Sequence, residues 1–128
     1  MILLDSLYSI LPADDRTMSL PDEGFAVYSV LLNPEHAIYG AHFPGNPITP
    51  GVCLVQMAVE LLSCHLNKSL ALKSMVNTKF LKPVSPMDGF PLTFEFKSDN
   101  KEGDYCANCS IVAGKDVCAR MKLICRQS

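Results

Sequence analysis

Apolar and polar residues follow two patterns along the chain, one typical of strands and one typical of a buried helix. Residues 25–32 are rich in β-branched and aromatic side chains and precede Asn33-Pro34, which predicts a strand that ends there. From Val52 to about Leu66 almost every residue is apolar, with good helix formers and no internal Gly or Pro. This length favours a helix, and because the helix is apolar around most of its circumference, other structure must wrap it.

Four more strands are predicted after the helix. The first covers residues 75–80, and the second starts at Leu92, from which apolar and polar residues alternate up to Lys97. The last two, residues 105–112 and 117–123, each follow a polar turn sequence. A single antiparallel sheet curled around one apolar helix accounts for this order, so the predicted fold class is α+β.

The first 24 residues have a mixed character. Their apolar positions suit a short amphipathic helix that ends near Pro12; these positions are Leu3, Leu4, Leu7, Ile10 and Leu11. The segment lacks the basic residues that begin a signal peptide, and acidic residues interrupt it. No apolar run reaches the roughly 18 residues of a membrane span. We therefore expect a soluble, cytoplasmic protein.

Size and charge narrow the possibilities further. The chain of 128 residues fits one domain, which we expect to cover residues 1–128. A chain this short leaves much apolar surface exposed, so association with another subunit is expected. The net charge of -2 argues against nucleic acid as a partner, because there is no basic excess to neutralise phosphates.

One pair of the six cysteines, Cys106 and Cys109, has the CxxC spacing of metal and redox sites. The pair lies in a predicted strand, where residues three apart point to opposite faces of the sheet. In a reducing compartment we expect the cysteines to act as small apolar side chains. The sequence therefore predicts no metal site.

Residues 49–52, Thr-Pro-Gly-Val, give the start of the long helix a candidate chemical role. Thr49 is a favourable N-cap, and Pro50 is a favourable first helical residue. The amides of Gly51 and Val52 then have no acceptor within the helix, and Gly51 lets a ligand approach its backbone closely. These amides suit a carbonyl oxygen that gains negative charge, as in a thioester that loses its α-proton. The alternative is a plain helix start with a tight turn.

His42 lies in the loop before that helix, where three prolines restrict the backbone. A neutral imidazole near pH 7 can take an α-proton and return it. The alternative is a solvated loop histidine. His36 and His65 receive no catalytic role.

The eleven residues from His42 to Val52, His-Phe-Pro-Gly-Asn-Pro-Ile-Thr-Pro-Gly-Val, resemble the signature of the β-hydroxyacyl-(acyl-carrier-protein) dehydratases, including every Pro and Gly. Residues 79–88 look like the strand and turn that follow the central helix in this family. The resemblance implies the hot-dog fold, in which an antiparallel sheet wraps one long central helix. It also implies a dimer with active sites at the subunit interface.

The resemblance implies roles for particular residues. His42 would be the catalytic histidine that acts at the α-carbon. The Gly51 amide would polarise the thioester carbonyl, and Val52, the next residue at the start of the helix, would also contact the substrate. The residues that would shape the narrow tunnel for the acyl chain are Phe43, Pro44 and Gly45.

The implied partner is an acyl-carrier protein that carries the acyl chain. Such carriers are acidic, and Lys68, Lys73, Lys79 and Lys82 are candidates for a basic patch after the helix. Dehydration needs only proton transfers and a polarised carbonyl, so neither a metal nor an organic cofactor is expected.

Gln56 is a departure from the family pattern. In the family a carboxylate stands five residues after the glycine that matches Gly51, and it helps the β-hydroxyl to leave. An amide can orient a hydroxyl but has no proton to transfer. Glu60 lies one turn further along the same stripe, about 5.4 Å of rise away. Together with Ser63 these residues could instead form a polar stripe that faces solvent or a neighbouring subunit.

We therefore predict a hydro-lyase that converts a β-hydroxyacyl thioester to the trans-2-enoyl thioester, with Gln56 beside His42 in the site. Two alternatives remain. The chain could be a catalytically weak or silent acyl-binding subunit of a mixed hot-dog dimer, or a thioesterase of the same fold.

Overall fold

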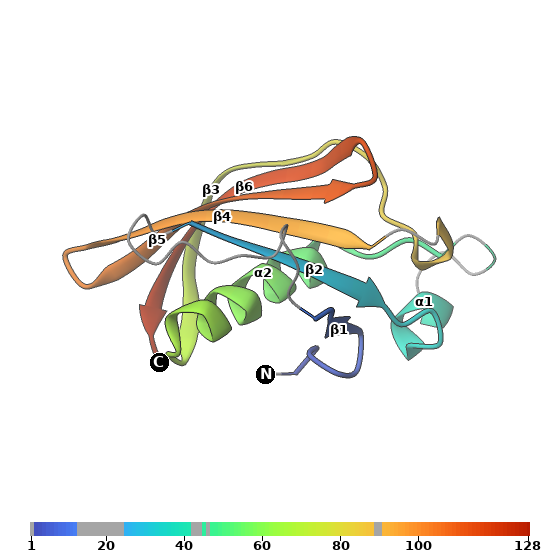
Figure 1. Ribbon diagram of the computed structural model, residues 1–128, viewed down its shortest axis with the longest axis horizontal. Coiled ribbons are helices and arrows are strands. Elements are labelled where there is room, and N and C mark those ends of the chain that lie inside the picture. The colour runs from blue at the N-terminus through green and yellow to red at the C-terminus, as the bar shows by residue number, and fades with distance from the viewer. Residues whose placement is uncertain (1, 13–24, 42–44, 46, 89–90) are drawn as a thin grey trace.

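The computed structural model describes residues 2–12, 25–41, 45, 47–88 and 91–128. Within these ranges the strands are β1 (Tyr8–Ile10), β2 (Phe25–Leu32), β3 (Leu70–Phe80), β4 (Leu92–Lys101), β5 (Asp104–Ala113) and β6 (Asp116–Gln127). They form one sheet in the order β1-β2-β4-β5-β6-β3, and every neighbouring pair is antiparallel. Helix α2 (Gly51–Leu66) packs against the concave side of this curved sheet (Figure 1). The predicted α+β architecture is confirmed.

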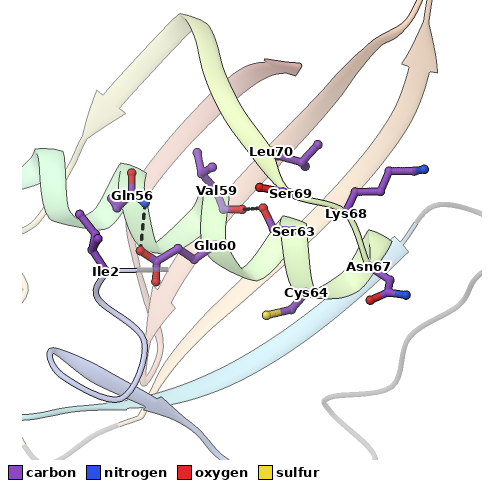
Figure 2. Close-up of a pocket in the computed structure, with 10 residues that line it drawn as sticks. All are labelled: Ile2, Gln56, Val59, Glu60, Ser63, Cys64, Asn67, Lys68, Ser69 and Leu70. Carbon is purple, nitrogen blue, oxygen red and sulfur yellow. Dashed lines mark hydrogen bonds between the residues drawn. The ribbon is translucent and has the colours of Figure 1, made fainter. Parts of the chain in front are cut away.

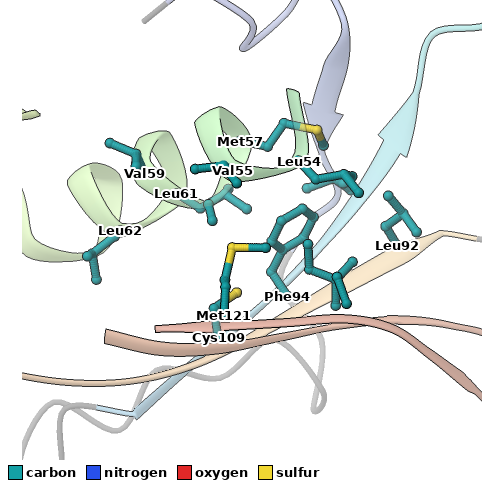
Figure 3. Close-up of a cluster of buried hydrophobic side chains, with 14 of the residues drawn as sticks. Leu54, Val55, Met57, Val59, Leu61, Leu62, Leu92, Phe94, Cys109 and Met121 are labelled. Carbon is teal, nitrogen blue, oxygen red and sulfur yellow. The ribbon is translucent and has the colours of Figure 1, made fainter. Parts of the chain in front are cut away.

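The core lies between α2 and the sheet. Leu54 and Leu61 of α2 face Phe94 on β4 and Met121 on β6 (Figure 3). These four side chains are at most 3% exposed. Burying a side chain of this size stabilises the fold by about 1.5–3 kcal/mol, so this cluster holds the helix on the sheet.

The later strands are longer than predicted. Residues 99–101 were expected in a turn, but they continue the ladder of β4 as far as the pair Lys101 and Asp104. The reversal then needs only Glu102 and Gly103, whose φ angles are 54° and 86°. Two consecutive positive φ values match the twist of a tight hairpin, so the strands can remain paired up to the turn.

The N-terminal segment is not the predicted amphipathic helix. A turn at residues 5–7 leads into β1, which pairs with the end of β2. Leu7 and Tyr8 are 0% and 1% exposed, so two adjacent side chains enter the interior instead of one helical stripe. The apolar spacing was compatible with either element, and pairing with β2 selects the strand.

A short helix, α1 (Ala37–Ala41), lies in the segment predicted as a loop. His36 supports its start, because its Nδ1 accepts a hydrogen bond from the Ile38 N–H at 3.0 Å. Tyr39 is the buried residue of α1. A one-turn 3-10 helix (Pro86–Asp88) precedes β4. No helix in the described part of the chain combines the length and apolar character needed to cross a bilayer.

Strand β3 forms one edge of the sheet and pairs with β6 alone among the described strands. Its apolar residues Leu72, Met75, Val76 and Phe80 are between 39% and 53% exposed. An edge strand with unpaired backbone groups and apolar side chains is a surface on which a second chain can continue the sheet.

Candidate active site

The predicted site residues fall in the segment from the end of α1 to the first two turns of α2. His42, Phe43 and Pro44 are outside the described residues. Gly45 is described and has φ = 84°, a left-handed conformation that glycine adopts at little cost.

The start of α2 differs by one residue from the prediction. Pro50, not Thr49, is the N-cap: its carbonyl accepts hydrogen bonds from the N–H groups of Cys53 and Leu54 at 3.0 and 3.2 Å. The Thr49 hydroxyl does not cap the helix, because it bonds to the Tyr39 hydroxyl at 2.9 Å. Gly51 is therefore the first helical residue, and its amide has no acceptor within the helix.

The Phe80 ring lies directly against Gly51. A Cβ at this position would lie 2.8 Å from Cζ of Phe80, closer than side chains pack. Gly51, Val52 and Phe80 line an apolar hollow of about 530 Å³ together with residues 48–50 and 81–84. The hollow offers apolar walls and the first amides of α2, which suits the carbonyl end of an acyl group.

Tyr39 and Thr49 tie the two ends of the loop together. Both are buried, at 5% and 4% exposure, and the Thr49 N–H also donates to the Val84 carbonyl at 2.7 Å. Burial raises the pKa of Tyr39, so its hydroxyl keeps its proton at neutral pH. These contacts fix the backbone on both sides of the segment that contains His42.

Gln56 and Glu60 lie on one stripe of α2, as predicted. The Gln56 Nε2 donates to Glu60 Oε2 at 2.9 Å (Figure 2). The solvent-facing alternative was wrong for Glu60 and Ser63, which are 2% and 5% exposed. The Ser63 hydroxyl donates a hydrogen bond to the Val59 carbonyl at 2.9 Å, within the same helix.

The N-terminal segment surrounds the Glu60 carboxylate. The backbone N–H groups of Leu3 and Leu4 donate to it at 3.1 and 2.9 Å, and the Tyr8 hydroxyl donates at 3.1 Å. Burial and the adjacent Glu60 raise the pKa of Tyr8, so its hydroxyl stays protonated and remains a donor. Sequence reasoning missed this contact, which spans more than fifty residues. The signal that could have found it is an acidic residue in the middle of an apolar helix, which requires partners when it is buried.

A larger hollow of about 700 Å³ borders this stripe of α2. Gln56, Val59 and Glu60 line one end, and Asn67, Lys68 and the start of β3 line the other (Figure 2). The hollow therefore runs along α2 past the residue that the sequence assigns to the β-hydroxyl.

The four candidate lysines do not form one patch. Lys73 pairs with Asp104 at 2.8 Å, and Lys82 pairs with Asp116 at 2.9 Å. Lys68 and Lys73 lie near the start of β3, whereas Lys79 and Lys82 lie near its end, roughly 20 Å away along an extended strand. The predicted cluster was wrong because the length of β3 separates one pair of lysines from the other.

The CxxC pair has the geometry expected of a strand. Cys109 is buried and Cys106 is half-buried on β5. Burial, with a smaller contribution from Glu95, raises the pKa of the Cys109 thiol and makes it a poor nucleophile at neutral pH. The described residues contain no group of three potential metal ligands.

Comparisons with known proteins agree with the geometry. Residues 18–120 match the family model described as ApeI-like, ApeI dehydratase. The 3-hydroxyacyl-(acyl-carrier-protein) dehydratase FabZ of Ehrlichia chaffeensis is 40% identical over 67% of this chain, which spans 63% of that relative's length. FabZ of Ehrlichia ruminantium is 34% identical over 81% of this chain and 76% of the relative.

Solved structures share the fold. The dehydratase heterocomplex ApeI:P from Xenorhabdus doucetiae gives a TM-score of 0.67 at 22% identity, covering 84% of this chain and 93% of the other. The (R)-hydratase from A. caviae gives a TM-score of 0.53 at 20% identity, covering 76% and 74%. The hot-dog fold implied by the sequence is confirmed, and the FabZ relatives support a 3-hydroxyacyl-(acyl-carrier-protein) dehydratase-like function. The chain belongs to the ApeI-like dehydratase family.

Proposed function

We propose that the protein dehydrates a β-hydroxyacyl thioester to the trans-2-enoyl thioester, with His42 as the base at the α-carbon. The observation that carries this proposal is the start of α2. There the first helical amides border an apolar hollow, a few residues after the loop position of His42.

The reaction removes a proton from the α-carbon and a hydroxyl from the β-carbon. His42 takes the α-proton, and the electron pair of that C–H bond moves toward the thioester carbonyl, whose oxygen the Gly51 amide stabilises. The pair then forms the carbon–carbon double bond as the β-carbon–oxygen bond breaks. The departing hydroxyl receives the proton back from His42, directly or through a water, and leaves as water.

Gln56 orients the β-hydroxyl in this proposal. Its amide cannot transfer a proton, so His42 serves as both base and acid. The acyl chain lies in the tunnel that Phe43, Pro44 and Gly45 shape, beside Val52.

The test is an assay of the purified protein with β-hydroxybutyryl and crotonyl thioesters, together with longer and aryl-conjugated ones. The wild type should interconvert hydroxyacyl and enoyl forms, and His42→Ala should lower kcat by roughly 10²–10⁴-fold. His36→Asn is the matched control, because asparagine can also cap α1, and it should keep wild-type activity. Release of free acid without enoyl product would instead indicate a thioesterase.

A second candidate function is that of a subunit in a mixed hot-dog dimer. Gln56 favours it, because the missing carboxylate would then come from the other chain. The similar structure from Xenorhabdus doucetiae is of a dehydratase heterocomplex, which supports the same idea. Inactive wild type that gains turnover when mixed with a family member whose own histidine is replaced by alanine would favour this candidate.

Either candidate function involves a dimer, and we propose that it forms along β3. The exposed apolar residues of that edge support this, with Met75 48% exposed. Met75→Glu should shift the sedimentation of the protein toward a monomer. Asn108→Glu, at an exposed position on β5, should leave it unchanged. A wild type that sediments as a monomer at all concentrations would contradict a homodimer.

The proposed partner is an acyl-carrier protein, and the proposed location is the cytoplasm. Lys79, exposed on β3, is the candidate contact for an acidic carrier. Lys79→Glu should raise KM for a carrier-bound substrate and leave KM for a pantetheine thioester unchanged.

A further inference from the structure

The orientation of the Gln56 amide depends on Glu60. Gln56 donates through Nε2, and Figure 2 shows its amide oxygen turned away from the carboxylate. The two ends of a side-chain amide have similar shapes but opposite hydrogen-bonding character. The end that faces Glu60 therefore decides which end a substrate meets.

Glu60 acts as an acceptor in all its contacts. Oε1 accepts from the Leu4 N–H at 2.9 Å and from the Tyr8 hydroxyl at 3.1 Å, and Oε2 accepts from the Leu3 N–H at 3.1 Å. Three donors of the N-terminal segment point at this carboxylate, which is 2% exposed, so its oxygens serve as acceptors on every side. Gln56 can complete this arrangement only with its NH₂ group.

We propose that Glu60 is a positioning residue that fixes the Gln56 amide so that Oε1 is presented to the β-hydroxyl of the substrate. An acceptor there takes a hydrogen bond from the hydroxyl's own proton. The lone pairs of the hydroxyl oxygen then remain available for the proton with which it leaves as water. The inference rests on the proposed role of Gln56 in dehydration.

Replacing Glu60 by glutamine should reverse this orientation. The new amide at position 60 satisfies Leu4 and Tyr8 with its oxygen, so its NH₂ group faces Gln56 and leaves the Leu3 N–H without an acceptor. The Gln56 amide then turns over to accept from it, and its own NH₂ group faces the substrate. In Glu60→Gln we expect kcat to fall about ten-fold, the effect of one ordinary hydrogen bond, with KM little changed.

Two further variants separate positioning from general stability. Tyr8→Phe removes a donor from Oε1 but leaves the contact between Oε2 and Gln56, so it should lower the melting temperature and keep kcat close to wild type. The double variant Gln56→Glu, Glu60→Gln exchanges the two groups and restores a donor facing an acceptor. It presents a carboxylate oxygen to the substrate, so its kcat should recover from that of Glu60→Gln.

The orientation of the Gln56 amide can also be followed without measuring activity. The side-chain amide of Gln56 gives a nuclear magnetic resonance signal that Gln56→Met identifies by its loss. This signal should move in Glu60→Gln, where the amide exchanges its partner, and stay in place in Tyr8→Phe.

The outcomes distinguish the inference from the proposed function. An unmoved Gln56 signal in Glu60→Gln would overturn the inference even if the wild type dehydrates its substrate. Equal losses of kcat in Tyr8→Phe and Glu60→Gln would also overturn it, since both would then act through stability. A signal that responds as expected in a protein without dehydratase activity would support the positioning and contradict the proposed function alone.

Discussion

Two turns of α2 differ in how far the rest of the chain covers them. In the middle of α2 the Glu60 carboxylate is 2% exposed, and four donors of its own chain surround it. At the first turn Val52 is 78% exposed, and Phe80, whose ring contacts Gly51, is 53% exposed. The N-terminal segment encloses the carboxylate of one turn, whereas the first turn remains exposed.

The difference follows from what each turn contains. A buried carboxylate is strongly destabilising without donors, so the same chain has to supply them for the fold to form. An apolar hollow bordered by helix amides carries no such requirement. It can stay open for a substrate or a second subunit. Changes at Glu60 should therefore affect stability first, and changes at Gly51 should affect activity first.

The largest expected effect on stability is that of Glu60→Ala. It leaves the amides of Leu3 and Leu4, the Tyr8 hydroxyl and the Gln56 NH₂ group without their acceptor, which should cost about 3–4 kcal/mol of unfolding free energy. Urea unfolding followed by circular dichroism measures it. Glu35→Ala, at an exposed position, is the control and should change this free energy by less than about 0.5 kcal/mol. A loss for Glu60→Ala as small as that of the control would show that this turn of α2 is not held by its carboxylate.

Gly51→Ala should act mainly on activity. The new methyl group would lie against the half-exposed Phe80 ring, which can move aside, so stability should change little. The same methyl group blocks the approach to the first helical amide, and kcat/KM should fall by about 10²-fold. Gly40→Ala is the control, because a Cβ there meets nothing within 4 Å. Unchanged activity in Gly51→Ala would exclude a carbonyl site at this amide.

Tyr39→Phe should destabilise the region beside the first turn of α2. It removes the hydroxyl that bonds to Thr49 and should cost about 1 kcal/mol, because Thr49 Oγ1 loses this buried partner. Thermal unfolding measures the change. Combining Tyr39→Phe with Thr49→Val should cost less than the sum of the two single changes, and strictly additive losses would contradict the contact.

The smallest expected effect is on the pH dependence of stability and concerns His65, near the C-terminal end of α2. Burial lowers the pKa of His65 from 6.5, and its ring lies edge-on to Tyr28 with the centroids 6.4 Å apart. The unfolded chain therefore binds this proton more readily, so stability should decline as the pH falls below 6.5 toward the folded pKa. His65→Gln should flatten that part of the stability profile, as measured by urea unfolding at several pH values. An identical slope in the variant would assign the decline to other groups.

Patterns within one element predicted much of the fold, whereas contacts between distant segments escaped them. The bounds of β2 match the prediction, and those of α2 differ by one residue, because both follow from hydrophobic periodicity within the element. The N-terminal segment was misassigned because its leucines fit a helix as well as a strand edge. Only pairing with β2 and the contacts to Glu60 determine the outcome.

In the candidate site, too, local placement was predictable from the sequence and contacts with distant residues were not. The placement of Gly51 at the helix start followed from local residue preferences, whereas the N-cap was displaced because Tyr39 binds the Thr49 hydroxyl. The stripe of Gln56 and Glu60 followed from helical spacing, but its burial did not, since the donors come from the other end of the chain. The roles of His42, Phe43 and Pro44 stay predictions.

The reverse reaction in heavy water tests most directly whether His42 acts at the α-carbon. An enoyl thioester incubated with the wild type in D₂O should gain a hydroxyl at the β-carbon and a single deuterium at the α-carbon, delivered by His42. His42→Ala should incorporate neither, while His36→Asn should behave as the wild type does. Hydration that persists undiminished in His42→Ala, or hydrolysis of the thioester without deuterium at the α-carbon, would contradict this role of His42.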